Sequence, residues 1–260
     1  MTAGRQHERG DRLLPAEVPR RRGGPPAPDV SRPRPRVEIR RVRGGLELRI
    51  DGTQASVHRP GGALTGVVWW ALASPILLLP PHRRRRVLLL GLAAGSVGRA
   101  LRALDPKAEI VGVELDQEVV RLARHHFGLD RLGIDLVVGD AIEFLRHDRR
   151  RFDLIVEDLF LGPSRSVRKP EWLLGEGYRL IRKQLRPGGY VVSNTIHEMP
   201  AIVRAMRPFG GRIVSLDVRG HWNRVTVCGR DLPAPRALRK ALAGRAETCR
   251  ILSRVTLRTR

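Results

Sequence analysis

The sequence predicts an α/β fold built on a mostly parallel, seven-stranded sheet. Seven apolar stretches have the length of buried strands, and the first five are separated by segments long enough for crossover helices, such as 117–128 and 171–185. Strands that alternate with helices in this way are typical of a parallel sheet covered on both faces. Only a tight connection joins the last two stretches, which predicts an antiparallel hairpin at the C-terminal end of the sheet. The predicted strands are 86–92, 109–115, 134–140, 152–158, 188–195, 211–218 and 223–229.

The segments around this core differ in composition. Residues 1–36 are rich in Arg, Pro and Gly and have few large apolar side chains, so we predict a disordered tail. Residues 37–60 alternate apolar and polar side chains, which predicts a small N-terminal β-subdomain. The main domain is expected to span 61–231 and to open with a helix through 63–73. Residues 232–260 are expected to form a basic helix, followed by a segment, "CRILSRVTLRTR", that the sequence leaves open between a final strand and a tail.

The basic charge of the chain is concentrated towards its two ends. The formal net charge is +23, which first suggests a nucleic-acid partner. Residues 87–200, however, carry 17 basic and 16 acidic side chains, whereas 1–86 carry 18 and 7, and 201–260 carry 14 and 3. Aromatic residues for base stacking are not interleaved with the arginines. Nucleic-acid binding through the basic ends therefore stays an alternative rather than the main expectation.

The remaining composition favours a cytoplasmic protein without a metal site. Cys228 and Cys249 match no metal-ligand spacing and make no disulfide framework. The apolar stretch 66–80 is too short and too interrupted by proline to span a bilayer, and no N-terminal segment has the apolar core of a signal peptide. We therefore expect no membrane partner, and the sequence leaves a homodimer open.

The stretch "VLLLGLAAGSVGRAL" (87–101) interrupts a run of large aliphatic residues with small ones. Gly91, Ala93, Gly95 and Ser96 place little side chain around the turn after the first main-domain strand, so a ligand can approach the main chain and the N-terminus of the next helix. A tight turn without a ligand is the alternative, because the spacing G-x-A-A-G departs from G-x-G-x-x-G. The turn favours a Rossmann-like nucleoside site at the carboxyl edge of the sheet.

Acidic residues follow the next three strands at the same edge. Glu114 ends the second strand, at the spacing where a carboxylate can accept hydrogen bonds from both ribose hydroxyls. Asp140 follows the third strand, where it either caps the next helix or, with the amide of Ala141, holds an adenine. Asp158 ends the fourth strand. We predict that Asp158 is the functional acid, because alternation along the strand turns Glu157 to the other side.

Together these positions resemble a known family. The stretches "VLLLGLAAGSVGRAL", "GVELD", "GDAIEFL", "FDLIVEDLFLGP" and "EGYRLIRKQLRPGGYVV" resemble successive motifs of the class I S-adenosylmethionine-dependent methyltransferase fold, and more narrowly of its spermidine synthase (aminopropyltransferase) branch. The upstream "LRIDGTQASV" is similar to the end of that branch's small N-terminal β-subdomain, which makes Gln54 a candidate substrate contact. The resemblance implies these roles: the donor's methionine portion beside Gly91 and Gly95, its ribose on Glu114, its adenine at Asp140 and the reacting amine at Asp158.

The chain departs from that branch on the acceptor side. Members typically read D-S-[ST]-D after the fourth strand, whereas Leu161 replaces the second acid here. Members also tend to carry Tyr, Glu and His on the helix before the first strand, where a gapless alignment places Val67, Trp69 and Ala73. A polyamine needs carboxylates to replace its hydration, so the departures argue against formation of spermidine itself. Trp69, and His197 just beyond the fifth strand, remain candidate acceptor contacts.

The sequence therefore predicts a transferase that uses S-adenosylmethionine or its decarboxylated form and passes an alkyl group, aminopropyl in the second case, to a small-molecule amine. Asp158 would take the proton that leaves the amine or orient the nitrogen. Two alternatives stay open: a methyltransferase that acts on a small molecule or RNA, and a homologue that binds a nucleoside without catalysis. The missing second acid favours the ordinary donor or an unusual acceptor, whereas the resemblance favours the decarboxylated donor.

Overall fold

The structure is a computed structural model that describes residues 35–62, 66–244 and 246–260. These residues belong to one compact unit, Arg34–Arg260. Apart from Pro35 and Arg36, the tail that we expect to be disordered lies outside the described residues. The boundaries expected near residues 60 and 231 stay predictions. In the described ranges, no helix is long and apolar enough to cross a membrane.

The described elements form a small sheet, a large sheet and the helices that cover the large one. The strands of the small sheet are β1 (Val37–Val42), β2 (Gly45–Ile50) and β3 (Thr53–His58). The strands of the large sheet are β4 (Arg86–Leu90), β5 (Glu109–Glu114), β6 (Ile134–Val138), β7 (Phe152–Glu157), β8 (Leu185–Thr195), β9 (Arg212–Val218), β10 (Arg224–Gly229) and β11 (Val255–Thr259). The α-helices are α1 (Val67–Ala73), α2 (Ser96–Leu104), α3 (Gln117–Phe127), α4 (Ala141–His147), α5 (Tyr178–Gln184), α6 (Met199–Met206), α7 (Pro235–Leu242) and α8 (Ala246–Leu252).

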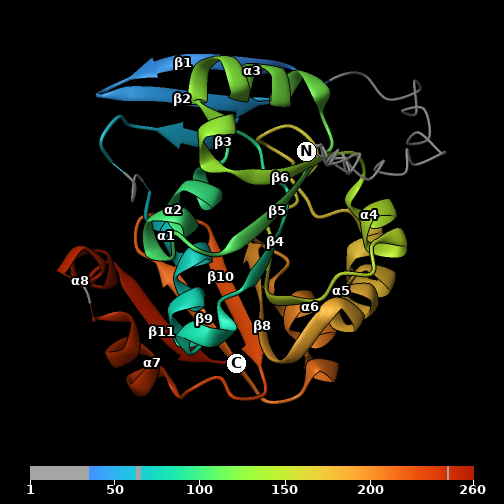
Figure 1. The fold of residues 1–260 in the computed structure, drawn as a ribbon, viewed down its shortest axis with the longest axis vertical. Coiled ribbons are helices and arrows are strands. Elements are labelled where there is room, and N and C mark those ends of the chain that lie inside the picture. Colours follow the sequence, from blue (N-terminus) through green and yellow to red (C-terminus); the bar gives the residue numbers. More distant parts are fainter. Residues whose placement is uncertain (1–34, 63–65, 245) are drawn as a thin grey trace, which may run out of the picture. The chain divides into compact units, whose positions relative to one another are not determined.

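The large sheet has the spatial order β11-β9-β10-β8-β7-β4-β5-β6 (Figure 1). Strands β4 to β8 pair in parallel, whereas β10 pairs antiparallel with β8 and β9. The seven predicted strands and the hairpin of β9 and β10 are thus confirmed. The expected number of strands was one too few, because the segment left open at the C-terminus contains β11, which pairs antiparallel with β9. In register, Val255 lies opposite Val218 and Leu257 opposite Leu216.

Alternation along the strands divides the core between the two faces of the large sheet. Along β4, Val87 and Leu89 belong to one apolar cluster, and Leu88 and Leu90 belong to the other. Helices α1, α2, α3 and α7 add buried side chains to the first cluster, and α4, α5 and α6 add theirs to the second. Figure 1 shows α1, α2 and α7 on one side of the sheet and α4 to α6 on the other. Both faces are covered, which explains why the central strands are apolar throughout.

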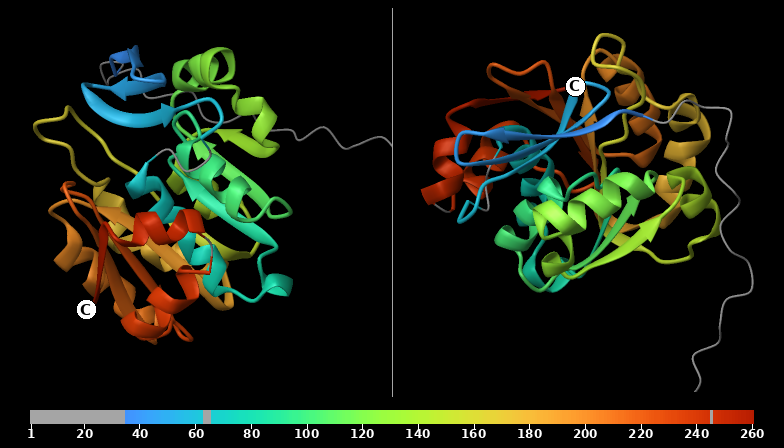
Figure 2. Two further views of the ribbon diagram at one scale, coloured as in Figure 1. Left: turned by 90° about the vertical axis from the view of Figure 1, so that its left-hand side faces the viewer. Right: turned by 90° about the horizontal axis from the view of Figure 1, so that it is seen from above.

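The three-stranded sheet lies over the carboxyl end of β4 (Figures 1 and 2). The Ser56 hydroxyl in β3 accepts a hydrogen bond from the Ala94 amide at 3.0 Å. The Ser96 hydroxyl, at the start of α2, accepts from the Val57 amide at 2.9 Å and donates to the Val57 carbonyl at 3.0 Å. Leu48 of β2 is fully buried in the first apolar cluster. The small sheet is therefore docked directly on the glycine-rich turn.

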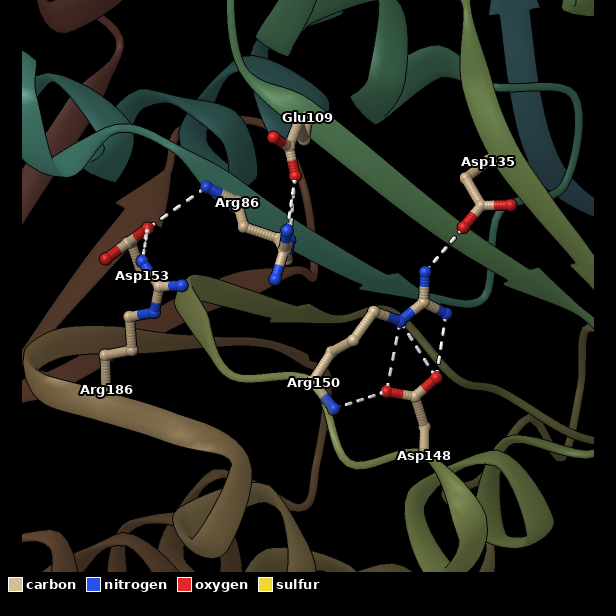
Figure 3. Close-up of polar contacts among 7 residues, drawn as sticks. All are labelled: Arg86, Glu109, Asp135, Asp148, Arg150, Asp153 and Arg186. Carbon is tan, nitrogen blue, oxygen red and sulfur yellow. Dashed lines mark hydrogen bonds and ion pairs between the residues drawn. The ribbon is translucent and has the colours of Figure 1, made fainter. Parts of the chain in front are cut away.

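The amino end of the large sheet is held together by polar side chains (Figure 3). Asp153 of β7 is buried, and it accepts hydrogen bonds from the Arg86 amide of β4 at 3.0 Å and from the Arg186 guanidinium of β8 at 3.4 Å. These contacts join three neighbouring strands. At the same end, Arg150 forms an ion pair with Asp135 of β6.

Candidate active site

The candidate site lies where the chain reverses its course across the sheet. From β4 the chain continues to β5 and β6 on one side, and it then places β7 on the other side of β4. Ligands of open α/β sheets bind at such a point, outside the carboxyl ends of the strands. Gly91 follows β4 and Asp158 follows β7, and the Asp158 amide donates to the Leu90 carbonyl at 2.9 Å. The turn that begins at Gly91 and the segment that carries Asp158 are therefore neighbours.

The glycine-rich turn uses left-handed backbone conformations. Gly91 and Gly95 have φ values of +85° and +83°, and Ala93 lies in the same region at +45°. A Cβ atom added at Gly91 would lie 2.6 Å from the Asp158 carbonyl oxygen. Glycine at position 91 therefore allows both the turn and the close approach of the segment that carries the predicted functional acid.

Glu114 is a buried carboxylate at the centre of this edge. Its Oε2 atom accepts a hydrogen bond from the Ala93 amide at 2.7 Å, and Oε1 accepts from the Asp116 amide at 3.1 Å. Burial raises the pKa of Glu114, and the backbone hydrogen bonds oppose this shift. An ionised carboxylate has about four acceptor positions, so these backbone donors leave it able to accept from a ligand as well.

The backbone amides of the turn donate to acceptors within the chain. The amides of Gly91 and Leu92 donate to the Val113 carbonyl, and the Gly95 amide donates to the Leu92 carbonyl. The remaining two amides, of Ala93 and Ala94, donate to the side chains of Glu114 and Ser56 described above. No amide from residue 91 to residue 95 is therefore left for a ligand in the described structure.

Asp140 and Ala141 begin α4 beside Glu114. The Gly139 amide donates to the Glu114 carbonyl at 2.8 Å, which fixes this segment next to β5. Asp140 is exposed and caps the helix, because its Oδ1 atom accepts from the Ile142 amide at 3.0 Å. Ala141 is buried as the first residue of α4. The cap uses one carboxylate oxygen of Asp140 and leaves the other outside this hydrogen bond.

Asp158 is half-buried and lies beside the end of β8. Its Oδ1 atom accepts a hydrogen bond from the Asn194 side-chain amide at 2.7 Å, and Asn194 Oδ1 in turn accepts from Asn223 Nδ2 at 3.0 Å. Burial raises the pKa of Asp158 to about 6, although the charge of Lys169 and the Asn194 hydrogen bond lower it. A carboxyl group with this pKa can accept a proton near neutral pH.

Glu157 points away into a buried ion pair. Its Oε1 atom lies 2.6 Å from Lys169 Nζ, and both side chains are almost fully buried, at 0% and 2% exposed. Glu157 also accepts from the Leu159 amide at 2.8 Å and from the Ser193 hydroxyl. The Lys169 ammonium lies 3.8 Å from the centre of the Phe160 ring. Glu157 thus contacts Lys169 and Ser193, whereas Asp158 contacts Asn194. These different partners agree with the prediction that alternation turns the two side chains apart.

Residues 159–170 connect β7 to the following helical segment and touch the small sheet. The amides of Leu161 and Arg168 each donate to the other's carbonyl, at 2.8 and 2.9 Å, which closes a small hairpin. At its tip, the Ser164 amide donates to the Asp51 carbonyl at 3.1 Å. We call this segment the 159–170 loop. Its tip is held by the hydrogen bond to Asp51, in the turn between β2 and β3, and its C-terminal end is held by the ion pair of Lys169 with Glu157.

Three predicted acceptor contacts lie in other segments: Gln54 in β3, Trp69 in α1 and His197 after β8. Gln54 is exposed and donates to Glu47 Oε2 at 2.9 Å. Trp69 is half-buried with its ring against Gly66, where an added Cβ would lie 2.2 Å from Trp69 Cε3. His197 is exposed. No described hydrogen bond joins any of the three to Asp158, and their roles stay predictions.

Sequence reasoning missed three side chains that complete the site. Asn194 could have been found from strand register, because Glu157 pairs with Ser193 and the next residues are then neighbours. Ser56 lies within the stretch "LRIDGTQASV", two residues after Gln54, but its contact with Ala94 depends on how the small sheet docks on the large one. Lys169 gave no signal, since a lysine in a polar loop is usually exposed.

Comparisons with known proteins agree with this geometry. Residues 73–209, more than half of the chain, match the Spermine/spermidine synthase domain family. A probable polyamine aminopropyl transferase of Bifidobacterium longum (strain NCC 2705) is 30% identical over 132 residues, which are 50% of this chain and 28% of that protein. Polyamine aminopropyltransferase 2 of Hyperthermus butylicus is 33% identical over 131 residues, which are 47% of this chain and 42% of that protein.

A solved structure is similar over most of the chain. The crystal structure of a probable spermidine synthase from Corynebacterium glutamicum ATCC 13032 gives a TM-score of 0.67 at 18% identity and covers 86% of both chains. This likeness shows the fold. The matched region spans less than half the length of either curated relative. On the match of residues 73–209, the chain belongs to the Spermine/spermidine synthase domain family.

Proposed function

We propose that this protein is an aminopropyltransferase that uses decarboxylated S-adenosylmethionine and a small amine. One observation carries the choice of donor: every backbone amide from Gly91 to Gly95 already donates a hydrogen bond within the chain. S-adenosylmethionine carries a carboxylate that needs donors when it leaves water. The side chains of the same edge, Glu114 and Asp158, are carboxyl groups that would repel it. A donor without the carboxylate fits this edge better.

The nucleoside part of the donor fits the residues present. The remaining acceptor capacity of Glu114 suits the ribose hydroxyls, and hydrogen bonds to a charged group contribute about 1.5–3 kcal/mol each. Asp140 and the amide of Ala141 are our candidates for the adenine edge, at the start of α4. Gly91 and Gly95 give the turn its left-handed backbone conformation, and we propose that the sulfur of the donor lies beside this turn.

The donor supplies a propyl carbon activated by its bond to a positively charged sulfur. Asp158 is proposed to hold the acceptor nitrogen in line with that carbon and to take its proton. The ammonium form of the acceptor first gives a proton to the Asp158 carboxylate, whose Oδ1 atom is held by Asn194, and this frees the nitrogen lone pair. The lone pair then forms the new N–C bond while the C–S bond breaks and leaves its electron pair on sulfur. Positioning of this kind accounts for most of the rate in such displacements.

We propose an acceptor with fewer charges than a polyamine. The second acid is absent at Leu161, and Glu157 is neutralised by the chain's own Lys169. We therefore assign the acceptor side a single acid, Asp158. Trp69 and His197 are the candidate contacts for the rest of the acceptor. A comparison of turnover with monoamines, diamines and polyamines should give the highest kcat/KM for an amine of low charge.

Thermal stabilisation tests the choice of donor before any acceptor is known. Decarboxylated S-adenosylmethionine, S-adenosylmethionine and methylthioadenosine are added at matched concentrations, and the melting temperature is recorded. We expect the first and third to stabilise the protein more than the second. A larger shift with S-adenosylmethionine would instead support a methyltransferase, and stabilisation without turnover of any amine would support a non-catalytic homologue.

Asp158→Asn tests the catalytic step. The amide cannot accept the amine proton, so we expect turnover to fall about 10²–10⁴-fold, while the affinity for methylthioadenosine stays within a few fold. The matched control is Asp135→Asn, an exposed acid at the opposite end of the sheet that pairs with Arg150. The control should leave turnover unchanged. Unimpaired turnover in Asp158→Asn would refute the proposed role.

A further inference from the structure

A basic hollow is lined by residues other than those of the candidate active site. It has a volume of about 400 Å³ and is formed by three parts of the chain: the end of β3, the middle of α2 and the segment 124–131 around the end of α3. Its cationic and titratable lining residues are His58, Arg99, Arg124, His125, His126 and Arg131. We call it the α3 hollow. It shares no lining residue with the turn, Glu114 or Asp158.

Positive charge in the α3 hollow exceeds the carboxylates available to it. The acid in its lining is Asp130, and its Oδ1 atom already pairs with Arg124 Nε at 3.0 Å. Within the described ranges, neither Arg99 nor Arg131 forms an ion pair. Two guanidinium groups therefore face the hollow without a carboxylate partner.

Two buried side-chain nitrogens in the lining also lack hydrogen-bond partners. Arg99 Nη2 donates to the Phe127 carbonyl at 2.8 Å, but Arg99 Nε is buried with no hydrogen-bond partner in the described part of the chain. His58 Nδ1 is in the same situation. Burial lowers the pKa of Arg99. Burial also lowers the pKa of His58, and the nearby charge of Arg99 lowers it further. An unpaired buried polar group is costly, and an anion placed between these groups would relieve both the missing hydrogen bonds and the repulsion.

We propose that the α3 hollow binds the phosphoryl group of a small phosphorylated metabolite. A phosphoryl group offers three acceptor oxygens and up to two negative charges, which matches two unpaired guanidinium groups and the histidines beside them. The volume lies within the range of small-molecule sites. A nucleic-acid track would instead need exposed aromatic rings for stacking, and Phe127, the one Phe, Tyr or Trp ring among the lining residues, is buried.

Calorimetric titration of the full chain with pyrophosphate at constant ionic strength tests the proposal. We expect saturable binding that Arg99→Gln and Arg131→Gln each weaken about tenfold or more. Arg131 is exposed, so its variant should fold even if loss of the half-buried Arg99 impairs folding. The matched control is Arg121→Gln, on the exposed side of α3 and paired with Glu118 outside the hollow. This control should change the dissociation constant less than about twofold.

Three results would overturn the proposal. The first is the absence of saturable binding by the unaltered protein. The second is an Arg121→Gln variant that loses as much affinity as Arg131→Gln, since attraction to overall positive charge would then explain binding. The third is a short single-stranded RNA that binds more tightly than pyrophosphate and loses affinity in the same two variants, which would assign the hollow to nucleic acid.

Discussion

At the scale of single residues, two carboxyl groups share one edge of the sheet but have different surroundings. Glu114 accepts from two backbone amides, whereas the Asp158 side chain accepts from the Asn194 amide group. Burial raises the pKa of both, to about 6 in Asp158. The backbone donors suit a fixed, ionised acceptor at Glu114. The weaker support at Asp158 suits a group that gains and loses a proton near neutral pH.

The pH dependence of turnover should follow the ionisation of Asp158. The base form exists above the pKa of about 6, so kcat/KM should rise as the pH increases through that value. Asn194→Ala removes a donor that stabilises the ionised carboxylate and lowers its pKa. We therefore expect the acid limb of the pH profile to move to higher pH in this variant.

A neighbouring asparagine provides the control for this profile. Asn223 donates to Asn194 rather than to Asp158, so Asn223→Ala should move the acid limb less than Asn194→Ala does. An acid limb that stays in place in Asn194→Ala would mean that another group controls the profile.

The sequence predicted the acids of this edge because each lies at or just beyond the end of an apolar strand. Glu114 ends β5, and Asp140 and Asp158 follow β6 and β7, so the strand order brings these positions to the same edge. Asn194 and Lys169 escaped prediction for different reasons. Asn194 needs the register between β7 and β8, and Lys169 becomes buried only because the 159–170 loop folds back onto Glu157.

At the scale of elements, the 159–170 loop depends on one buried ion pair. Loss of one partner leaves an uncompensated charge in a buried place, which typically costs about 3–5 kcal/mol. Lys169→Met should therefore lower the free energy of unfolding by about this amount. The double variant Lys169→Met with Glu157→Gln removes both charges and should recover a large part of the loss. Urea unfolding of the four proteins in the cycle measures the coupling.

The matched control for this cycle is Arg168→Met, one residue earlier in the same loop. Arg168 joins the loop hairpin through its backbone, and its side chain is not part of the buried pair. We expect this variant to keep stability within about 0.5 kcal/mol. An additive cycle, with no recovery in the double variant, would show that Lys169 and Glu157 stabilise the fold independently.

Elements with continuous apolar runs could be predicted from the sequence, whereas elements defined by their partner could not. Strands β4, β5 and β7 are buried on both faces, so their composition alone identifies them. β11 carries Thr256 and Arg258 between its apolar residues, and it becomes a strand by pairing with β9 at the edge of the sheet. The alternating pattern predicted the small sheet, but its position on the large sheet depends on the hydroxyl contacts of Ser56 and Ser96.

At the scale of the whole described unit, the two ends of the large sheet have different tasks. The carboxyl end carries Glu114, Asp158 and the glycine-rich turn, while the amino end carries the polar contacts of Figure 3. Asp153, near the start of β7, joins β4, β7 and β8 there, whereas Asp158 follows the other end of β7. We therefore expect changes at the amino end to alter stability without altering the chemistry.

Asp153→Asn tests this separation. Asp153 is buried and its carboxylate accepts from a backbone amide and from Arg186, so loss of its charge should lower the free energy of unfolding by about 1–3 kcal/mol. The matched control is Glu109→Gln, an exposed acid that pairs with the Arg86 side chain at the same end of the sheet. Its effect should stay within about 1 kcal/mol, as for other surface pairs.

In both variants the acid limb of the pH profile should remain near pH 6, because Asp158 keeps its neighbours. Urea unfolding and pH profiles of the same preparations check the two expectations together, and a displaced acid limb in Asp153→Asn would show that the ends of the sheet are coupled.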